Sequence, residues 1–169
     1  MEDLNVLIGP NGAGKSNLIE ALALMRAAPI APQTTSNADV RGVVRRGGGA
    51  QEWVWKGAKD QPACIELIVN HPKGKKPLRH VFKFAGDAPG FWLDDERIED
   101  ESPYGDQTDP YFYYRFNGGH PVVNVAGQQK RKLALETVNL EQSILSQRRD
   151  PEIYPEITYL ADTYEKWRI

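Results

Sequence analysis

The chain has 169 residues, of which 40% are hydrophobic and 26% are charged, and its formal net charge is −2. This composition is ordinary for a globular domain with its own core, and bulk charge gives no argument for nucleic-acid binding. No apolar run is long enough to span a membrane, and the first residues lack the basic start of a secretory signal. A single cysteine, Cys64, excludes an internal disulfide, so we expect a cytoplasmic protein.

The chain starts with a short apolar run, residues 4–8, which is followed by a glycine-rich turn and a helical pattern. An apolar run of this length before glycine predicts a buried strand. Apolar residues then recur at helical spacing up to Met25, and Pro29 ends the pattern. We therefore expect a strand and a helix over residues 1–30 and an exposed loop over residues 31–51.

The turn between this strand and helix carries the strongest motif of the chain. The run GPNGAGKS, residues 9–16, fits the pattern G-x-x-x-x-G-K-[ST] at every required position. Its glycines allow a tight bend in which backbone amides point at phosphate oxygens, and the following helix adds the positive end of its dipole. Lys15 supplies a cation for the β- and γ-phosphates, and the Ser16 hydroxyl is placed to ligate Mg²⁺. The predicted nucleotide-binding residues are Asn11, Gly12, Ala13, Gly14, Lys15, Ser16 and Asn17.

From residue 52 the pattern becomes typical of strands. ACIELIV and LRHVFKF each predict one strand, GFWLDDERIEDE predicts a pair, and YFYYRF and HPVVNV flank turn residues as in a hairpin. Strands this close together, without helices between them, imply antiparallel pairing. We expect an antiparallel β-subdomain over residues 52–127, with Cys64 in its core and residues 94–101 as a solvated hairpin face.

A nucleotide hydrolase also needs an acidic pair at the end of an apolar strand. Asp94, Asp95 and Glu96, in FWLDDE, are the tempting candidates. We reject them because the apolar run is short and lies in the antiparallel region, whereas a Walker B strand belongs beside residues 4–8. No other segment of the chain qualifies. The scattered groups of lysine and arginine are interpreted as solvated loops rather than as a phosphate-backbone site.

Residues 128–169 return to a helical pattern. Pro155 suits the first turn of a helix, and the apolar residues of one helical face are Ile157, Leu160, Ala161, Tyr164 and Trp167. No glycine or other stop signal follows them, so we expect the helical region to continue beyond the 169 residues.

The stretch GPNGAGKSNLIEAL resembles the Walker A segment of ABC-type ATPase heads of the RecF, SMC and OLD kind, in which asparagine often follows the serine, as Asn17 does here. The stretches YYRFNGGHPVVNV and LEQSILSQRRDPEIYPEITYLADTYEKWRI are similar to a group of predicted bacterial AAA/RecF-like ATPases. The resemblance implies an α/β P-loop fold with an antiparallel β-subdomain, and a Q-loop that opens a helical region over residues 128–169. Gln147 would be the Q-loop glutamine, reaching Mg²⁺ or the attacking water, so Lys15 and Gln147 are the catalytic candidates.

The same resemblance implies ATP as the ligand, hydrolysis by the full-length protein, and self-association of two heads around ATP. The Walker B, signature and switch residues of such heads would lie beyond residue 169. We therefore expect this one truncated head segment to bind ATP weakly and to hydrolyse almost none. Three functions stay open for the whole protein: an ATP-driven DNA transaction such as repair or chromosome maintenance, a nuclease-coupled or phage-defence ATPase, and a nucleotide-dependent interaction module without significant hydrolysis.

Overall fold

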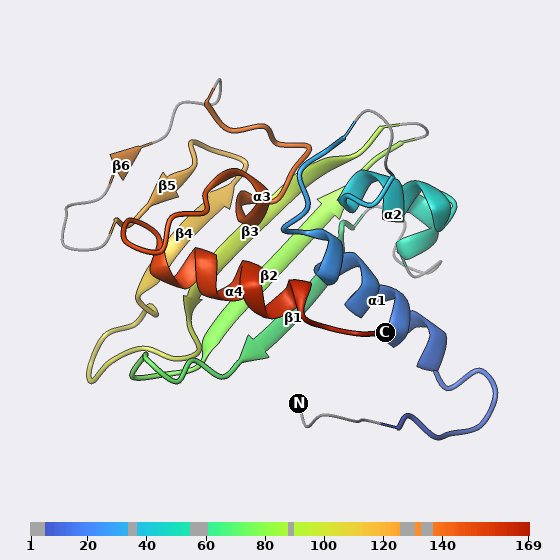
Figure 1. Ribbon diagram of the computed structural model, residues 1–169, viewed down its shortest axis with the longest axis horizontal. Helices are drawn as coiled ribbons and strands as arrows, with labels where there is room; N and C mark the ends of the chain where they lie inside the picture. Colours follow the sequence, from blue (N-terminus) through green and yellow to red (C-terminus); the bar gives the residue numbers. More distant parts are fainter. Residues whose placement is uncertain (1–5, 34–36, 55–60, 88–89, 126–130, 133–136) are drawn as a thin grey trace.

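The computed structural model describes residues 6–33, 37–54, 61–87, 90–125, 131–132 and 137–169. Within these ranges one six-stranded sheet forms, with its strands in chain order and every neighbouring pair antiparallel (Figure 1). The strands are β1 (Ala63–Val69), β2 (Leu78–Ala85), β3 (Trp92–Asp100), β4 (Phe112–Asn117), β5 (Val122–Val123) and β6 (Arg131–Lys132). The helices are α1 (Lys15–Ala27), α2 (Val40–Arg46), the 3₁₀-helix η1 (Ala50–Trp53), α3 (Ile144–Gln147) and α4 (Pro155–Glu165).

Strand β2 shows how the alternating pattern builds the sheet. Its even-numbered residues Leu78, His80, Phe82 and Phe84 are buried, whereas Arg79 and Lys83 between them are partly exposed. Side chains of a strand point alternately to its two faces, so one face of β2 is apolar apart from His80. The strands predicted from ACIELIV and LRHVFKF are therefore confirmed as β1 and β2, and the predicted hairpin is confirmed as β4 and β5.

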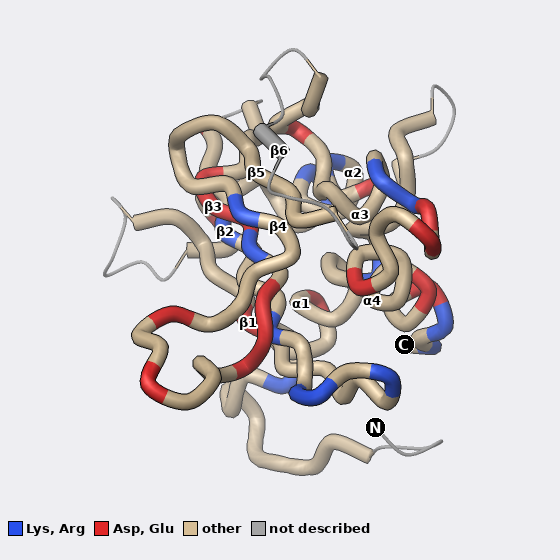
Figure 2. The backbone as a smooth tube through the Cα atoms, turned by 90° about the vertical axis from the view of Figure 1, so that its left-hand side faces the viewer, with Lys and Arg blue, Asp and Glu red and all other residues tan. Residues whose placement is uncertain are grey.

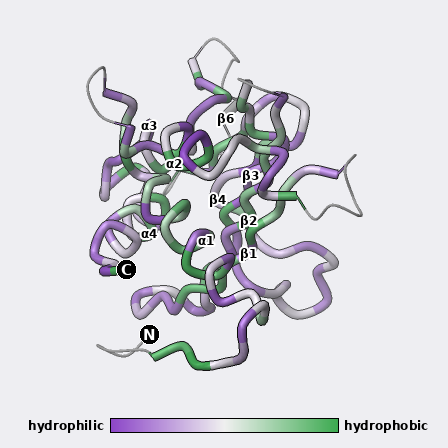
Figure 3. Tube along the Cα trace, turned by 90° about the vertical axis from the view of Figure 1, so that its right-hand side faces the viewer, coloured by the Kyte–Doolittle hydropathy of each residue, from purple (hydrophilic) through white to green (hydrophobic). Residues whose placement is uncertain are grey.

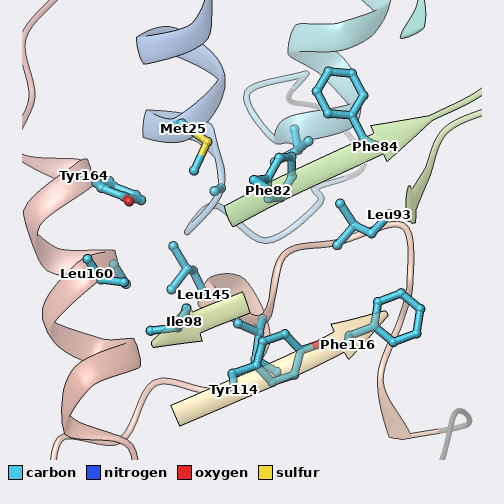
Figure 4. Packing of buried hydrophobic residues seen from close by; sticks show 14 of the residues in the cluster. Met25, Phe82, Phe84, Leu93, Ile98, Tyr114, Phe116, Leu145, Leu160 and Tyr164 are labelled. Carbon is cyan, nitrogen blue, oxygen red and sulfur yellow. The ribbon is translucent and has the colours of Figure 1, made fainter. Parts of the chain in front are cut away.

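Helices cover one face of this sheet, and the hydrophobic core lies between them and the strands (Figures 1 and 2). Met25 of α1, Leu145 of α3 and Leu160 of α4 converge on Phe82 and Tyr114 of the sheet (Figure 4). All five side chains are at most 1% exposed. Burial of each of them contributes about 1.5–3 kcal/mol, so this layer contact supplies much of the stability of the fold.

Two β-bulges change which side chains of the strands face the core. The pairing of β2 with β3 shifts between Lys83 and Phe84, which leaves Asp94 as an extra residue in β3. Because of this extra residue, Glu96 pairs with Phe82 and faces the core. Likewise, the pairing of β3 with β4 shifts at Glu99, which leaves Tyr113 as the extra residue in β4.

The acidic run at residues 94–101 is a correction to the sequence analysis. GFWLDDERIEDE forms one strand, β3, rather than a pair of strands, and four of its acidic side chains are at most 2% exposed: Asp95, Glu96, Glu99 and Asp100. Their burial is possible because each has polar partners, as buried charges require. Arg79 Nη2 lies 2.5 Å from a Glu99 oxygen, and Arg97 Nη2 lies 3.0 Å from Asp95 Oδ2.

The expected strand before the glycine-rich turn is the second correction. Residues 6–8 form no strand, and Val6, Leu7 and Ile8 are 74%, 48% and 89% exposed. Figure 3 shows this apolar segment outside the body of the molecule. The physical reason is that a strand needs a neighbour for its backbone hydrogen bonds, and the described strands all pair with one another at a distance from this segment. The rest of the expected strand, residues 4 and 5, lies outside the described residues.

Two smaller expectations also differ from the structure. The segment over residues 31–51 contains α2 and the start of η1, because Asp39 accepts a hydrogen bond from the Gly42 amide and so caps α2. Cys64 is exposed, because it alternates with the inward-facing residues of β1. The last predicted helix is confirmed as α4, with Pro155 in its first turn, but α4 ends at Glu165, before Trp167 and before the end of the chain. None of the described helices is long and apolar enough to cross a membrane.

Candidate nucleotide-phosphate site

Residues 9–16 form an exposed turn that leads directly into α1, and we call this turn the phosphate loop. Two of its glycines, Gly12 and Gly14, have φ of 80°, the left-handed conformation that other residues rarely adopt. The Ala13 amide donates to the Pro10 carbonyl at 3.3 Å, which closes the turn. A Cβ atom at either glycine would meet no atom within 4 Å, so backbone conformation, rather than crowding, is what requires glycine here.

Lys15, the first residue of α1, folds back over this loop. Its Nζ donates to the carbonyl oxygens of Gly9 and Pro10 at 2.7 and 2.6 Å. The ammonium group is therefore held against the loop backbone, where a phosphate group in the loop would meet it. A lysine in this position offers a positive charge at the end of a flexible side chain.

The N-terminus of α1 adds further donors and a favourable field. Gly14 is its N-cap residue and makes no side-chain cap, so the first amides of the helix keep free hydrogen-bonding capacity. The first turn contains no acidic side chain that would repel a phosphate. Ser16 and Asn17 are exposed in the same turn. Free amides, the positive end of the helix dipole and an ammonium group together make a site for anionic oxygen atoms.

The residues present therefore fit a nucleotide phosphate with its magnesium ion. Gly12 and Gly14 allow the tight turn, Lys15 carries the positive charge, and the Ser16 hydroxyl offers an oxygen ligand for Mg²⁺. Among the described residues no group of three or more His, Cys, Asp or Glu side chains could hold a metal ion. A magnesium ion here would take most of its ligands from phosphate and water, as this ion commonly does.

Gln147 is not brought near the phosphate loop. It ends α3, which Figure 1 shows well apart from the start of α1. Its side-chain amide instead closes its own turn: Oε1 accepts from the Asn139 amide at 2.8 Å, and Nε2 donates to the Asn139 and Gln142 carbonyls at 3.0 and 3.1 Å. In this structure Gln147 holds the segment before α3 in place, and its role at a nucleotide stays a prediction.

Asp94, Asp95 and Glu96 lie in β3, in the middle of the antiparallel sheet. Their position in an antiparallel sheet agrees with the prediction that they are not a Walker B pair. An open cleft of about 510 Å³ lies elsewhere, between α2, the turn at residues 47–49, and Phe91. Its lining includes no residue of the phosphate loop, whose residues 9–14 are exposed.

Sequence reasoning missed a set of polar side chains that meet inside the core, which we call the buried polar network: His80, Glu96, Ser143 and Tyr164. Each is at most 1% exposed. His80 carried a signal, since it shares the inward face of LRHVFKF with three apolar residues. Glu96 carried none, because simple alternation from Leu93 points it away from the core and only the bulge at Asp94 reverses this.

Comparison with known proteins identifies a family of ATPase domains. A family model described as "AAA domain, putative AbiEii toxin, Type IV TA system" matches residues 4–120. The match spans the phosphate loop, α1, α2 and the sheet through β4, and it stops before α3. No curated protein and no solved structure matches the chain.

Proposed function

Since the chain belongs to this AAA domain family, a group of P-loop ATPase domains, we propose that it binds ATP at the phosphate loop, with Mg²⁺. The single observation that carries the proposal is the loop itself: two left-handed glycines lead into a helix whose first residue, Lys15, lies folded over the turn. The loop amides and the Lys15 ammonium hold the phosphate oxygens, and Ser16 ligates the metal ion that screens their charge.

Substitution of Lys15 by alanine tests the proposal. The Lys15→Ala variant should bind ATP·Mg²⁺ at least about tenfold more weakly in isothermal titration, because a charge-assisted hydrogen bond contributes about 1.5–3 kcal/mol. The matched control is Lys75→Ala, which removes an equally flexible, exposed lysine from the turn between β1 and β2. Equal affinities of the Lys15→Ala variant and the unaltered chain would refute the assignment.

Hydrolysis of ATP is a separate part of the proposal. In the described structure no carboxylate lies on a strand beside the phosphate loop, because the acidic residues of β3 are in the antiparallel sheet. We propose that the chain alone turns over almost no ATP. A steady-state assay in which the chain hydrolyses ATP at a rate that depends on Lys15 would contradict this.

The cellular process has two leading candidates, a RecF/SMC-like DNA transaction and a defence-type ATPase of the OLD-like kind. The family description names a toxin of a toxin–antitoxin system, which favours the second. Charge also gives the first little support, because Arg79, Lys83, Arg97 and Arg115 of the sheet each lie within 4 Å of a buried carboxylate. Self-association around ATP and a role of Gln147 at the nucleotide remain parts of this proposal that rest on the resemblance alone.

Fluorescence anisotropy with a labelled DNA duplex separates the two candidates. The defence-type candidate predicts no binding of the duplex by the protein, with or without ATP, at physiological salt. Salt-dependent binding that ATP changes would favour the DNA transaction instead.

A further inference from the structure

The buried polar network joins four elements that are far apart in the chain. Glu96 Oε1 of β3 accepts from the Ser143 hydroxyl at 2.5 Å, and Glu96 Oε2 accepts from the Ile144 amide at 2.9 Å. His80 Nε2 of β2 lies 3.3 Å from Glu96 Oε1, and His80 Nδ1 lies 3.1 Å from the Tyr164 hydroxyl of α4. The network therefore runs without a gap from α4, through the sheet, to the first residue of α3.

The directions of the two hydrogen bonds of His80 follow from its tautomer. Glu96 accepts from the Ser143 hydroxyl and from the Ile144 amide, and in the tautomer of His80 that carries its proton on Nε2 the imidazole is a third donor to Glu96. With that proton on Nε2, Nδ1 accepts from the Tyr164 hydroxyl. Burial, together with the charge of Glu96, raises the pKa of Tyr164 well above its usual value, so the hydroxyl keeps its proton.

Helix α3 depends on this network more than a longer helix would. It has only four residues, and its first turn is held by two contacts: Glu96 accepts from the Ile144 amide, and Ser143 Oγ accepts from the Leu145 amide at 3.1 Å. A helix this short is not stable by itself, so its structure comes from what holds its ends. Ser143 has both roles, since it donates to Glu96 and caps α3.

We propose that the buried polar network couples the folding of α3 to the packing of α4 against the sheet. We call this coupling the latch. When α4 is packed against the sheet, Tyr164 orients His80 and His80 orients the Glu96 carboxylate. Glu96 in turn holds the start of α3. When α4 moves away, the carboxylate loses the imidazole that orients it, and α3 with the segment before it loosens. The inference is independent of nucleotide binding, since none of these residues belongs to the phosphate loop.

Amide hydrogen exchange on the full chain tests the latch. Tyr164→Phe removes only the hydroxyl, and we expect exchange of the Ile144 and Leu145 amides to become at least about tenfold faster, with less than threefold change in the amides of β2 and β3. Tyr159→Phe is the matched control, because its hydroxyl on the same helix donates to the Asn70 carbonyl and not to the network. Unchanged exchange in α3, or an equal acceleration in α3 and in the sheet, would overturn the proposal.

The reverse experiment uses the other end of the network. Coupling between two sites is reciprocal, so Ser143→Ala should speed exchange of the Tyr164 and Glu165 amides by at least about threefold. Ser146→Ala is its control, since Ser146 donates to the Ser143 carbonyl in the same turn without touching Glu96. If Ser143→Ala affects only α3, as the loss of a local cap would, the latch is refuted.

Discussion

Lys15 and Glu96 show two ways in which a single charged residue finds its partners in this chain. Lys15 donates to two carbonyl oxygens of its own exposed loop, and such bonds exchange readily for a phosphate oxygen. Glu96 is 0% exposed and its two oxygens accept from two elements of the fold. The first arrangement suits a residue that binds a ligand, and the second suits a residue that holds the fold together.

Glu156, in the first turn of α4, provides a test of buried charge at the scale of one residue. Burial, and secondarily the nearby charge of Asp100, raise the pKa of Glu156. A carboxyl with a raised folded-state pKa binds its proton more tightly than the unfolded chain does. Its contribution to stability is therefore full below the unfolded pKa, about 4.3, and is lost as pH rises through the folded pKa.

We therefore expect Glu156→Gln to stabilise the protein at pH 7, by less than about 1 kcal/mol because the side chain is partly exposed. The gain should disappear near pH 3.5, where Glu156 itself is protonated. Urea unfolding at the two pH values measures this difference, and Glu152→Gln, at an exposed position just before α4, is the control. A gain of equal size at both pH values would show that charge is not its cause.

At the scale of elements, helix α4 is the part that the sequence predicted best. The spacing of Ile157, Leu160 and Tyr164 placed them on one helical face, and all three are at most 1% exposed in the structure. Pro155 begins the helix as its fixed φ allows. Strands β1 and β2 were equally predictable, because their inward and outward residues alternate without interruption.

Strand β3 was predictable as a strand but not in the direction of its side chains. An extra residue in one strand reverses the faces of all the residues that follow it, and nothing in the letters LDDERIED marks Asp94 as that residue. The same limit applies to Tyr113 in β4, whose hydroxyl donates to Asp100 Oδ1 at 2.9 Å. Bulge positions depend on how two strands fit together, which a single sequence does not display.

The packing of α4 against the sheet can be tested directly by a substitution in the core. Leu160 is fully buried between α4 and the sheet, so Leu160→Ala should destabilise the protein by about 2–5 kcal/mol. Urea unfolding, monitored by tryptophan fluorescence, gives this free energy. Ile153→Ala, just before the helix at a position 41% exposed, should change it by less than about 1 kcal/mol. Similar losses in the two variants would mean that α4 does not pack as described.

At the scale of the whole molecule, the phosphate loop lies outside the layer that gives the protein its stability. The core is formed by the sheet and the helices over one of its faces, whereas residues 6–16 extend away from it (Figure 3). The sequence predicted the turn before α1, α1 itself and the antiparallel pairing of the strands correctly. It did not predict that residues 6–8 would lack a strand, because strand formation depends on a partner elsewhere in space and not on local apolar character.

This separation makes the proposed site of ATP binding observable apart from the stability of the fold. In the ¹⁵N-labelled chain, titration with ATP·Mg²⁺ should shift the amide resonances of Gly12, Gly14, Lys15 and Ser16 most strongly, and should leave those of β2 and β3 nearly unchanged. The same titration of Lys15→Ala should lose these shifts while its sheet resonances stay in place. The account would be contradicted if ATP shifted other amides and left the phosphate loop unaffected, or if it shifted none.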